Sequence, residues 1–178
     1  MYKEDVEMKI VIIINGRGGA GKDTLCGFAA EGFKSESHSS IDPIKEIASK
    51  YGWKGDKDSR SRKFLSDLKR VFAEYNDLPT VYLMEKYHAF LQNGNELFFA
   101  HIREAEEIKK FKSKVESPCV TLLIRRNDRM GDWGNASDDG VEDIAYDYVY
   151  DNDRDLDTAR REFIELMNKI GEDLGFHV

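Results

Sequence analysis

Short apolar runs alternate along the chain with longer segments in which apolar residues recur every three or four positions. Short runs rich in β-branched residues are typical of buried strands, and the three-to-four spacing is typical of amphipathic helices. The pattern predicts five strands, at residues 10–14, 37–41, 96–102, 120–124 and 148–150. It also predicts six helices, at residues 22–32, 42–52, 59–75, 79–93, 103–111 and 155–174.

The alternation of strands and helices predicts the class of fold. Strands that alternate with helices form a parallel sheet with helices on both faces, and such a sheet binds its ligands at the carboxyl ends of its strands. With 178 residues, of which 40% are hydrophobic, the chain is long enough for one compact domain with a full core. We therefore expect a single α/β domain spanning residues 1–178.

Two segments of this domain carry further expectations. The helix at 59–75 has a set of apolar residues at helical spacing that should face inward: Phe64, Leu65, Leu68, Val71 and Phe72. The segment at 126–146 is polar, contains glycines and is long for a connection. It is therefore expected to be either a lid or a disordered segment.

The net charge of −7 at pH 7 limits the kinds of partner. It argues against a general nucleic-acid binder and against binding to an anionic membrane surface. No apolar stretch reaches the ~18 residues of a membrane span, and the first residues, MYKEDVEMK, lack the apolar core of a signal peptide. Cys26 and Cys119 lie in or beside apolar runs without metal-ligand spacing, as in reduced cytoplasmic proteins. We expect a cytoplasmic protein with neither nucleic-acid nor membrane partners, which binds anions through local clusters of basic residues.

A glycine-rich turn joins the first strand to the first helix. It contains Gly16, Gly18, Gly19, Ala20 and Gly21. Phosphate oxygens must approach backbone N–H groups closely, and glycine allows the positive φ angles that turn those groups inward. The N-terminus of the next helix adds its dipole, and Lys22 supplies a full charge for the outer phosphates of a nucleotide. A turn that only closes a β-α unit is the alternative, but strand, turn, lysine and helix all occur at the spacing of a phosphate site.

The residue after this lysine departs from the usual pattern. The pattern is G-x-x-x-x-G-K-[ST], whereas here Asp23 follows the lysine and the hydroxyl comes one place later, at Thr24. A carboxylate beside phosphates would repel them unless a cation lay between. We therefore assign Asp23 and Thr24 to a Mg²⁺ site. Asp23 would reach the metal directly or through a water molecule, and Thr24 would hydrogen-bond the α- or β-phosphate.

Five short motifs follow one another along the chain. They are GxxxxGKDT at 16–24, D-P-[IL]-K at 42–45, [IV]-R-x-x-x-E at 102–107, R-R at 125–126 and Y-D-Y-V-x-x-N at 146–152. Together they resemble the deoxynucleoside monophosphate kinase-like branch of the P-loop nucleotide kinases. The resemblance covers most of the chain, and the P-loop is its most specific motif.

The resemblance implies a fold and an activity. The fold is the adenylate-kinase-like arrangement, a three-layer P-loop NTPase sandwich whose five-stranded parallel sheet has the order 2-3-1-4-5. The segment at 42–93 is then a helical acceptor-binding insertion, and the segment at 126–146 is a lid that closes over ATP. The activity is ATP- and Mg²⁺-dependent transfer of the γ-phosphoryl group to a nucleoside or deoxynucleoside monophosphate.

The resemblance also assigns roles to charged residues, since phosphoryl transfer depends mainly on positioning and positive charge. The acceptor site receives Asp42, Lys45, Arg62, Arg103 and Glu104. The lid entrance carries Arg125, Arg126 and Arg129. A transition-state arginine can contribute ~10³ to 10⁵ in rate. We assign catalysis to Lys22, Arg126 and Arg129, with Arg126 as first choice because a surface salt bridge could occupy Arg125. Arg125 is assigned to nucleotide binding.

Alternatives to these assignments remain open. The acceptor-side cations could be solvated helix charges, an interpretation preferred for Arg60 and Arg62. The family usually places a Mg²⁺-binding aspartate near the end of the third strand, where this chain has His101, and Glu104 is a candidate for the acidic role. A kinase of another small phosphorylated metabolite, and a nucleotide-binding module that hydrolyses slowly or not at all, are the alternative functions. The sequence also allows a homodimer.

Overall fold

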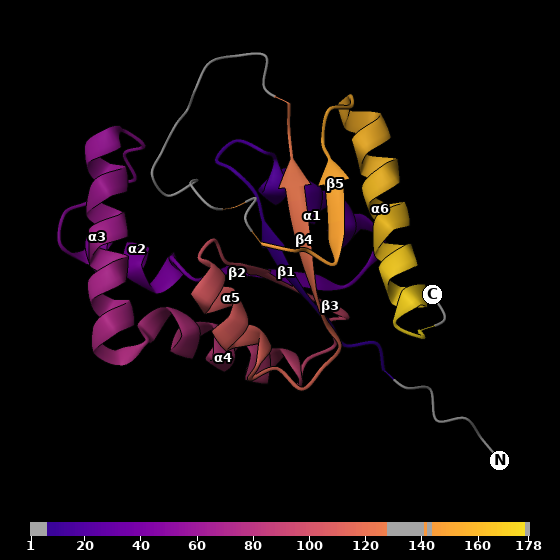
Figure 1. The fold of residues 1–178 in the computed structure, drawn as a ribbon, viewed down its shortest axis with the longest axis horizontal. Coiled ribbons are helices and arrows are strands. Elements are labelled where there is room, and N and C mark those ends of the chain that lie inside the picture. Colours follow the sequence, from indigo (N-terminus) through magenta and orange to yellow (C-terminus); the bar gives the residue numbers. More distant parts are fainter. Residues whose placement is uncertain (1–6, 128–140, 142–143, 177–178) are drawn as a thin grey trace.

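A five-stranded parallel sheet forms the centre of the molecule (Figure 1). The computed structural model describes residues 7–127, 141 and 144–176. The strands are β1 (Ile10–Asn15), β2 (Ser35–Ser39), β3 (Leu97–His101), β4 (Cys119–Arg125) and β5 (Tyr148–Asp151). The helices are α1 (Lys22–Gly32), α2 (Asp42–Lys50), α3 (Ser59–Asn76), α4 (Leu78–Phe90), α5 (Ala105–Lys112) and α6 (Leu156–Asp173).

The strands lie in the order β2-β3-β1-β4-β5, and each neighbouring pair is parallel. The order 2-3-1-4-5 expected from the sequence is therefore confirmed. β1 is the central strand, and strands covered on both faces are apolar throughout. Because all strands run in one direction, their carboxyl ends share one edge of the sheet. The turn after β1 lies in the middle of that edge, where ligands of such sheets bind.

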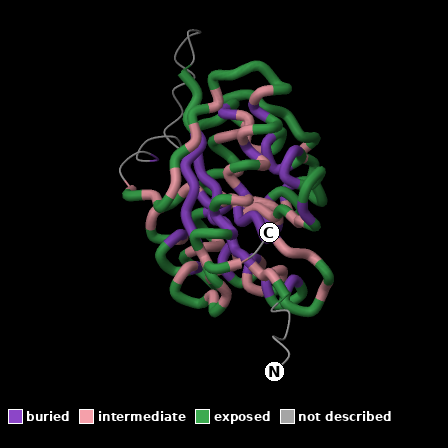
Figure 2. Tube along the Cα trace, turned by 90° about the vertical axis from the view of Figure 1, so that its right-hand side faces the viewer, coloured by how far each residue is buried: buried purple, intermediate pink, exposed green. Residues whose placement is uncertain are grey.

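Alternate residues of β1 enter two separate cores. Ile10, Ile12 and Ile14 pack on the face that α1 and α6 cover. Val11 and Ile13 pack on the opposite face, against α4 and α5. Figure 2 shows the buried residues concentrated in the middle of the molecule, along the strands. The molecule is thus the three-layer α/β/α sandwich that the sequence predicts.

The elements begin and end close to the expected positions, with one difference that affects the site. α5 begins at Ala105 instead of residue 103, because Glu104 has an extended backbone (φ −78°, ψ 127°). Arg103 and Glu104 therefore lie in the turn between β3 and α5, at the carboxyl edge of the sheet. In the described ranges, none of the helices combines the length and the apolar character needed to cross a membrane.

The predicted inward face of α3 is partly wrong. Phe64 and Val71 are 45% and 50% exposed, and the buried residue of this helix is Lys69. α3 lies at the side of the molecule and packs on α2 and α4 instead of on the sheet (Figure 1). Helical spacing identifies an apolar stripe, but it does not show how much of that stripe the neighbouring helices cover.

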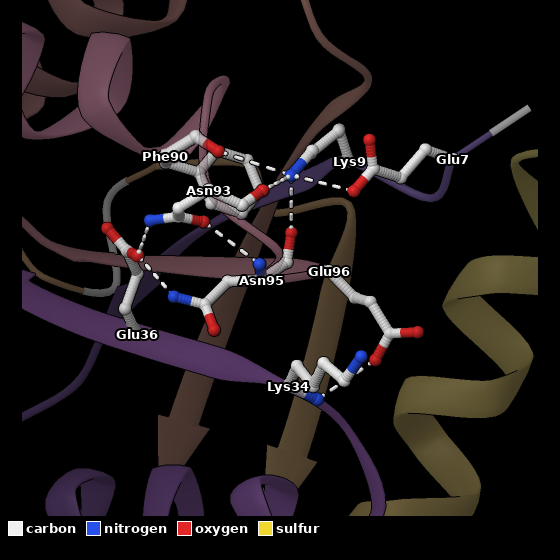
Figure 3. A network of polar contacts seen from close by, with 8 residues as sticks. All are labelled: Glu7, Lys9, Lys34, Glu36, Phe90, Asn93, Asn95 and Glu96. Carbon is white, nitrogen blue, oxygen red and sulfur yellow. Dashed lines mark hydrogen bonds and ion pairs between the residues drawn. The ribbon is translucent and has the colours of Figure 1, made fainter.

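A network of polar contacts joins the start of β1 to the end of α4 (Figure 3). The ammonium group of Lys9 donates hydrogen bonds to the backbone carbonyl oxygens of Phe90, Asn93 and Asn95. These carbonyls belong to the last residue of α4 and to residues after it, where carbonyl groups lack intrahelical partners and a cation is stabilising. The side-chain amides of Asn93 and Asn95 donate to the carboxylate of Glu36 in β2. The network lies at the amino end of β1, so we assign it to the stability of the fold.

Candidate functional site

The turn between β1 and α1 has a conformation that requires glycine. Gly19 and Gly21 have φ angles of 81° and 90°, in the region that side chains disfavour. Gly16 has a φ of 149°, and a Cβ atom there would overlap the carbonyl oxygen of Ile124 in β4. Ala20, also in the turn, is buried. The backbone conformation of the turn and its close approach to β4 therefore require glycine at positions where a phosphate site also needs it.

Replacing Gly16 by alanine should lower the free energy of unfolding by about 2–4 kcal/mol, because the new Cβ atom combines backbone strain with overpacking against β4. Urea unfolding would measure this change. The matched control is Gly27→Ala in α1, where a Cβ atom meets nothing within 4 Å. That variant should gain up to about 1 kcal/mol. Equal stability of the two variants would contradict the described turn.

Two asparagines hold the turn near its two ends. Asn15 is fully buried. Its Oδ1 accepts a hydrogen bond from the backbone N–H of Gly16 at 2.8 Å, and its Nδ2 donates to the carbonyl oxygen of Arg103 at 3.1 Å. Nδ2 of Asn152, after β5, donates to the carbonyl oxygen of Ala20 at 2.9 Å. Sequence reasoning assigned no role to either residue, although Asn15 ends an apolar run and Asn152 ends one of the five motifs.

The side chain of Lys22 folds back onto the start of the turn. Its ammonium group donates hydrogen bonds to the carbonyl oxygens of Gly16 at 2.6 Å and Arg17 at 3.0 Å. α1 begins at Lys22, and its N-cap residue, Gly21, has no side chain to accept hydrogen bonds from the first N–H groups. A helix N-terminus of this kind offers N–H donors together with the positive end of the helix dipole. The turn can therefore bind an anion through backbone donors and one ammonium group.

The turn opens into a cleft of about 920 Å³. The turn and α1 line it with Gly18, Gly19, Gly21, Lys22, Asp23 and Thr24. Other elements line it with Asp42, Lys45, Arg62, Arg103, Glu104 and Arg126. All of these residues were assigned to the site from the sequence. The structure brings them to one cleft, while their separate roles stay predictions.

The arginines of the expected lid are placed differently from one another. Arg126 lines the cleft. The Nε atom of Arg125 lies 2.9 Å from a carboxylate oxygen of Asp151 in β5, the salt bridge considered from the sequence. Arg129 lies outside the described residues, as does most of the segment at 126–146. The lid therefore stays a prediction, and of the three arginines at its entrance Arg126 is the one that the described structure places in the cleft.

The two acidic residues assigned to the acceptor site already have partners. The carboxylate of Asp42 accepts a hydrogen bond from the backbone N–H of Ser39 at 2.7 Å. The ammonium group of Lys69 lies 2.5 Å from Glu104 and 2.8 Å from Glu107. Burial opposes the ionisation of Glu104, but the charge of Lys69 and the hydrogen bonds to this carboxylate together outweigh burial and lower the pKa of Glu104, whereas burial raises the pKa of Glu107. The pairing of Glu104 argues against its replacing a metal-binding aspartate.

Lys69 joins α3 to the turn that carries Arg103, and its side chain is 8% exposed. Lys69→Met should lower the free energy of unfolding by about 3 kcal/mol, because it leaves two carboxylates without their counter-charge. Lys63→Met is the matched control on the same helix. Lys63 pairs with Asp67, but both side chains are exposed, so that variant should lose at most about 0.5 kcal/mol. Chemical denaturation of both variants would measure the difference, and equal losses would contradict a buried role for Lys69.

His101 occupies the carboxyl end of β3, beside the first turn of α1. Its Nε2 lies 2.7 Å from Oγ of Ser37, and its Nδ1 lies 3.9 Å from Oδ1 of Asp23. Burial lowers the pKa of His101, so the imidazole is neutral at neutral pH. Sγ of Cys26 lies 3.8 Å from Nε2, and burial raises the pKa of this thiol to about 12. His101 lines the cleft, so a neutral ring nitrogen lies close to the carboxylate assigned to the metal.

Two residues in the first turn of α1 fit a divalent cation that arrives with a nucleotide. Asp23 and Thr24 offer oxygen ligands, which Mg²⁺ prefers, and the side chain of Asp23 is 99% exposed. Over the described ranges, no group of three or more His, Cys, Asp or Glu side chains is placed to hold a metal ion. A metal ion bound beside Asp23 would therefore take further ligands from phosphates and water.

Solved structures share this fold. Dephospho-CoA kinase from Campylobacter jejuni is 16% identical, with 94% of this chain and 100% of that chain covered and a TM-score of 0.56. A sugar kinase from Janibacter sp. is 16% identical, with 96% and 99% covered and a TM-score of 0.51. APS kinase from Mycobacterium tuberculosis in complex with AMPPNP and APS is 13% identical, with 90% and 98% covered and a TM-score of 0.51. No protein-family model and no curated protein sequence matches the chain. The likeness to the solved structures shows a P-loop kinase fold.

Proposed function

We propose that the protein is an ATP- and Mg²⁺-dependent phosphotransferase that moves the γ-phosphoryl group of ATP to a nucleoside or deoxynucleoside monophosphate. One observation carries this proposal. The cleft that holds the phosphate-binding turn with Lys22 also contains cations from other elements, namely Lys45 of α2, Arg62 of α3 and Arg103 after β3. With a phosphorylated donor at the turn and a phosphorylated acceptor at these cations, the cleft would supply the positioning on which phosphoryl transfer depends.

The turn is the proposed donor site. Backbone N–H groups at the start of α1 would bind the phosphate chain of ATP, and Lys22 would leave the carbonyl oxygens of Gly16 and Arg17 for the outer phosphates. The APS kinase from Mycobacterium tuberculosis was solved with AMPPNP, a nucleotide of this kind, which supports the assignment by likeness of fold. Asp23 and Thr24 would hold Mg²⁺, which neutralises the charge that develops on the phosphates.

The acceptor site is proposed on the insertion formed by α2, α3 and α4. Lys45, Arg62 and Arg103 would bind the acceptor's phosphate, whose charge the net −7 of the whole chain would otherwise repel. An oxygen of that phosphate attacks the γ-phosphorus. The bond between the γ-phosphorus and the oxygen that bridges it to the β-phosphate breaks, and ADP leaves. Arg126 lines the same cleft and would stabilise the transferring group.

A kinase of a different small phosphorylated metabolite is the second candidate. The structural neighbours include a dephospho-CoA kinase and an APS kinase, so this fold is not tied to one class of acceptor. The cations of the acceptor site would bind a phosphate, and they would not distinguish acceptors that differ in the rest of their structure. We place the protein in the cytoplasm, because its free thiols belong in a reducing compartment.

A panel of phosphorylated acceptors, incubated with ATP and Mg²⁺, tests the proposal. Formation of ADP together with a nucleoside diphosphate, from any nucleoside monophosphate, supports it. Transfer to another phosphorylated metabolite alone favours the second candidate. Tight binding of ATP without transfer to any acceptor would favour a nucleotide-binding module instead.

A further inference from the structure

The imidazole of His101 has one nitrogen occupied and the other directed at Asp23. Nε2 lies 2.7 Å from the hydroxyl oxygen of Ser37, so one of these two groups donates a hydrogen bond to the other. Nδ1 lies 3.9 Å from Oδ1 of Asp23, too far for a hydrogen bond between them. The ring is held between β2 and α1, and its side chain is 13% exposed. The position of Nδ1 is therefore fixed by the fold.

The hydroxyl group of Ser37 leaves both neutral forms of His101 available. A serine hydroxyl can donate or accept a hydrogen bond, and neutral imidazole carries its single proton on either nitrogen. When Nε2 carries the proton and donates to Ser37, Nδ1 presents a lone pair toward the carboxylate of Asp23. Two electron-rich atoms that face each other at 3.9 Å are stabilised by a cation between them.

We propose that Nδ1 of His101 and the carboxylate of Asp23 jointly ligate the metal ion that accompanies the nucleotide, and that this nitrogen ligand makes the site prefer Mn²⁺ to Mg²⁺. The inference rests on the proposed nucleotide site. Two atoms that each lie about 2.1 Å from one metal ion are between about 3 and 4.2 Å apart, depending on the angle at the metal. The observed 3.9 Å lies in that range but exceeds the ~3 Å between adjacent ligands of an octahedral ion, and rotation of the Asp23 side chain, which is 99% exposed, can close the difference. Mg²⁺ selects oxygen ligands, whereas imidazole nitrogen suits the transition metals.

Neighbouring groups do not offer the same pair of ligands. Sγ of Cys26 lies 3.8 Å from Nε2 of His101, the nitrogen that contacts Ser37, and not beside Nδ1, which faces Asp23. His38 also lines the cleft, but its Nε2 lies 3.1 Å from a carboxylate oxygen of Glu36. Glu104 is paired with Lys69. Of the metal-ligating side chains described around the cleft, His101 is the one with a nitrogen facing Asp23.

Pulsed electron paramagnetic resonance of bound Mn²⁺ tests this inference directly. Protein containing ¹⁵N-histidine is mixed with Mn²⁺ and AMPPNP, and the spectrum is compared with that of unlabelled protein. We expect a histidine nitrogen coupling that changes with the isotope. The coupling should disappear in His101→Gln, or in His101→Asn if the first variant does not fold, and should persist in the control His38→Gln.

A competition measurement provides a second readout. The affinity for AMPPNP is measured with Mn²⁺ and with Mg²⁺ in the wild type and in His101→Asp. The preference for Mn²⁺ should fall by about tenfold or more when the nitrogen ligand becomes an oxygen ligand. Binding of Mn²⁺ and AMPPNP by the wild type without a histidine coupling would overturn this inference and leave the proposed function in place. Failure of the wild type to bind AMPPNP with either metal would overturn both.

Discussion

Replacing Lys22 by alanine should reduce phosphoryl transfer by about 10³-fold or more and weaken the binding of ATP. The ammonium group lies at the mouth of the turn, within hydrogen-bond distance of two of its carbonyl groups, where the outer phosphates of a bound nucleotide would replace those partners. In phosphoryl transfer the protein supplies mainly positioning and charge, so the loss of one charge that contacts the transferring group has a large effect. Steady-state transfer from ATP to the acceptor identified in the panel measures the rate.

The control for this variant is Lys169→Ala, which removes a lysine from α6, away from the cleft. It should leave transfer unchanged, and both variants should unfold at temperatures close to that of the wild type. Transfer at the wild-type rate by Lys22→Ala would refute the assignment of the turn as the donor site.

Arg126→Ala should lower kcat by about 10³-fold and change the KM for ATP little. Arg126 follows β4 and lines the cleft, whereas its neighbour Arg125 is paired with Asp151. A cation that contacts the transferring phosphoryl group acts mainly in the transition state, so its loss affects the chemical step more than binding. Arg126→Lys keeps the charge without the planar fork and should recover part of the rate.

Arg161→Ala in α6 is the matched control, since this arginine is exposed and does not line the cleft. It should keep the wild-type kcat. A rise in the KM for ATP with an unchanged kcat in Arg126→Ala would show that Arg126 binds the nucleotide in the ground state and that the transition-state role is wrong.

The central part of the fold could be predicted from the sequence because its signals are local and strong. The apolar run of β1 identifies a strand buried on both faces, and the turn that follows identifies the edge of the sheet at which ligands bind. The sheet order came from the resemblance and is confirmed by the strand pairing. The exposure of Phe64 and Val71 could not be predicted, since it depends on how α3 meets α2 and α4.

The candidate site was predictable where chemistry is carried by charge or by glycine spacing. Lys22, Arg103 and Arg126 stand out in a sequence, and the structure places all three along one cleft. Asn15 and Lys69 were missed because their importance comes from contacts between distant segments. Asn15 links the turn to residue 103, and Lys69 of α3 pairs with two carboxylates near the start of α5. Single-sequence patterns carry no signal for such pairs.

Calorimetric titration of the wild-type protein with AMPPNP, in the presence of Mg²⁺ or Mn²⁺, measures whether the turn after β1 binds a nucleotide. Backbone N–H groups around residue 20 and the ammonium group of Lys22 should bind its phosphate chain. We predict saturable binding at one site per chain, which Lys22→Ala weakens strongly and Lys169→Ala leaves unchanged. The absence of binding for any purine triphosphate with either metal would contradict the donor site and the phosphotransferase activity built on it.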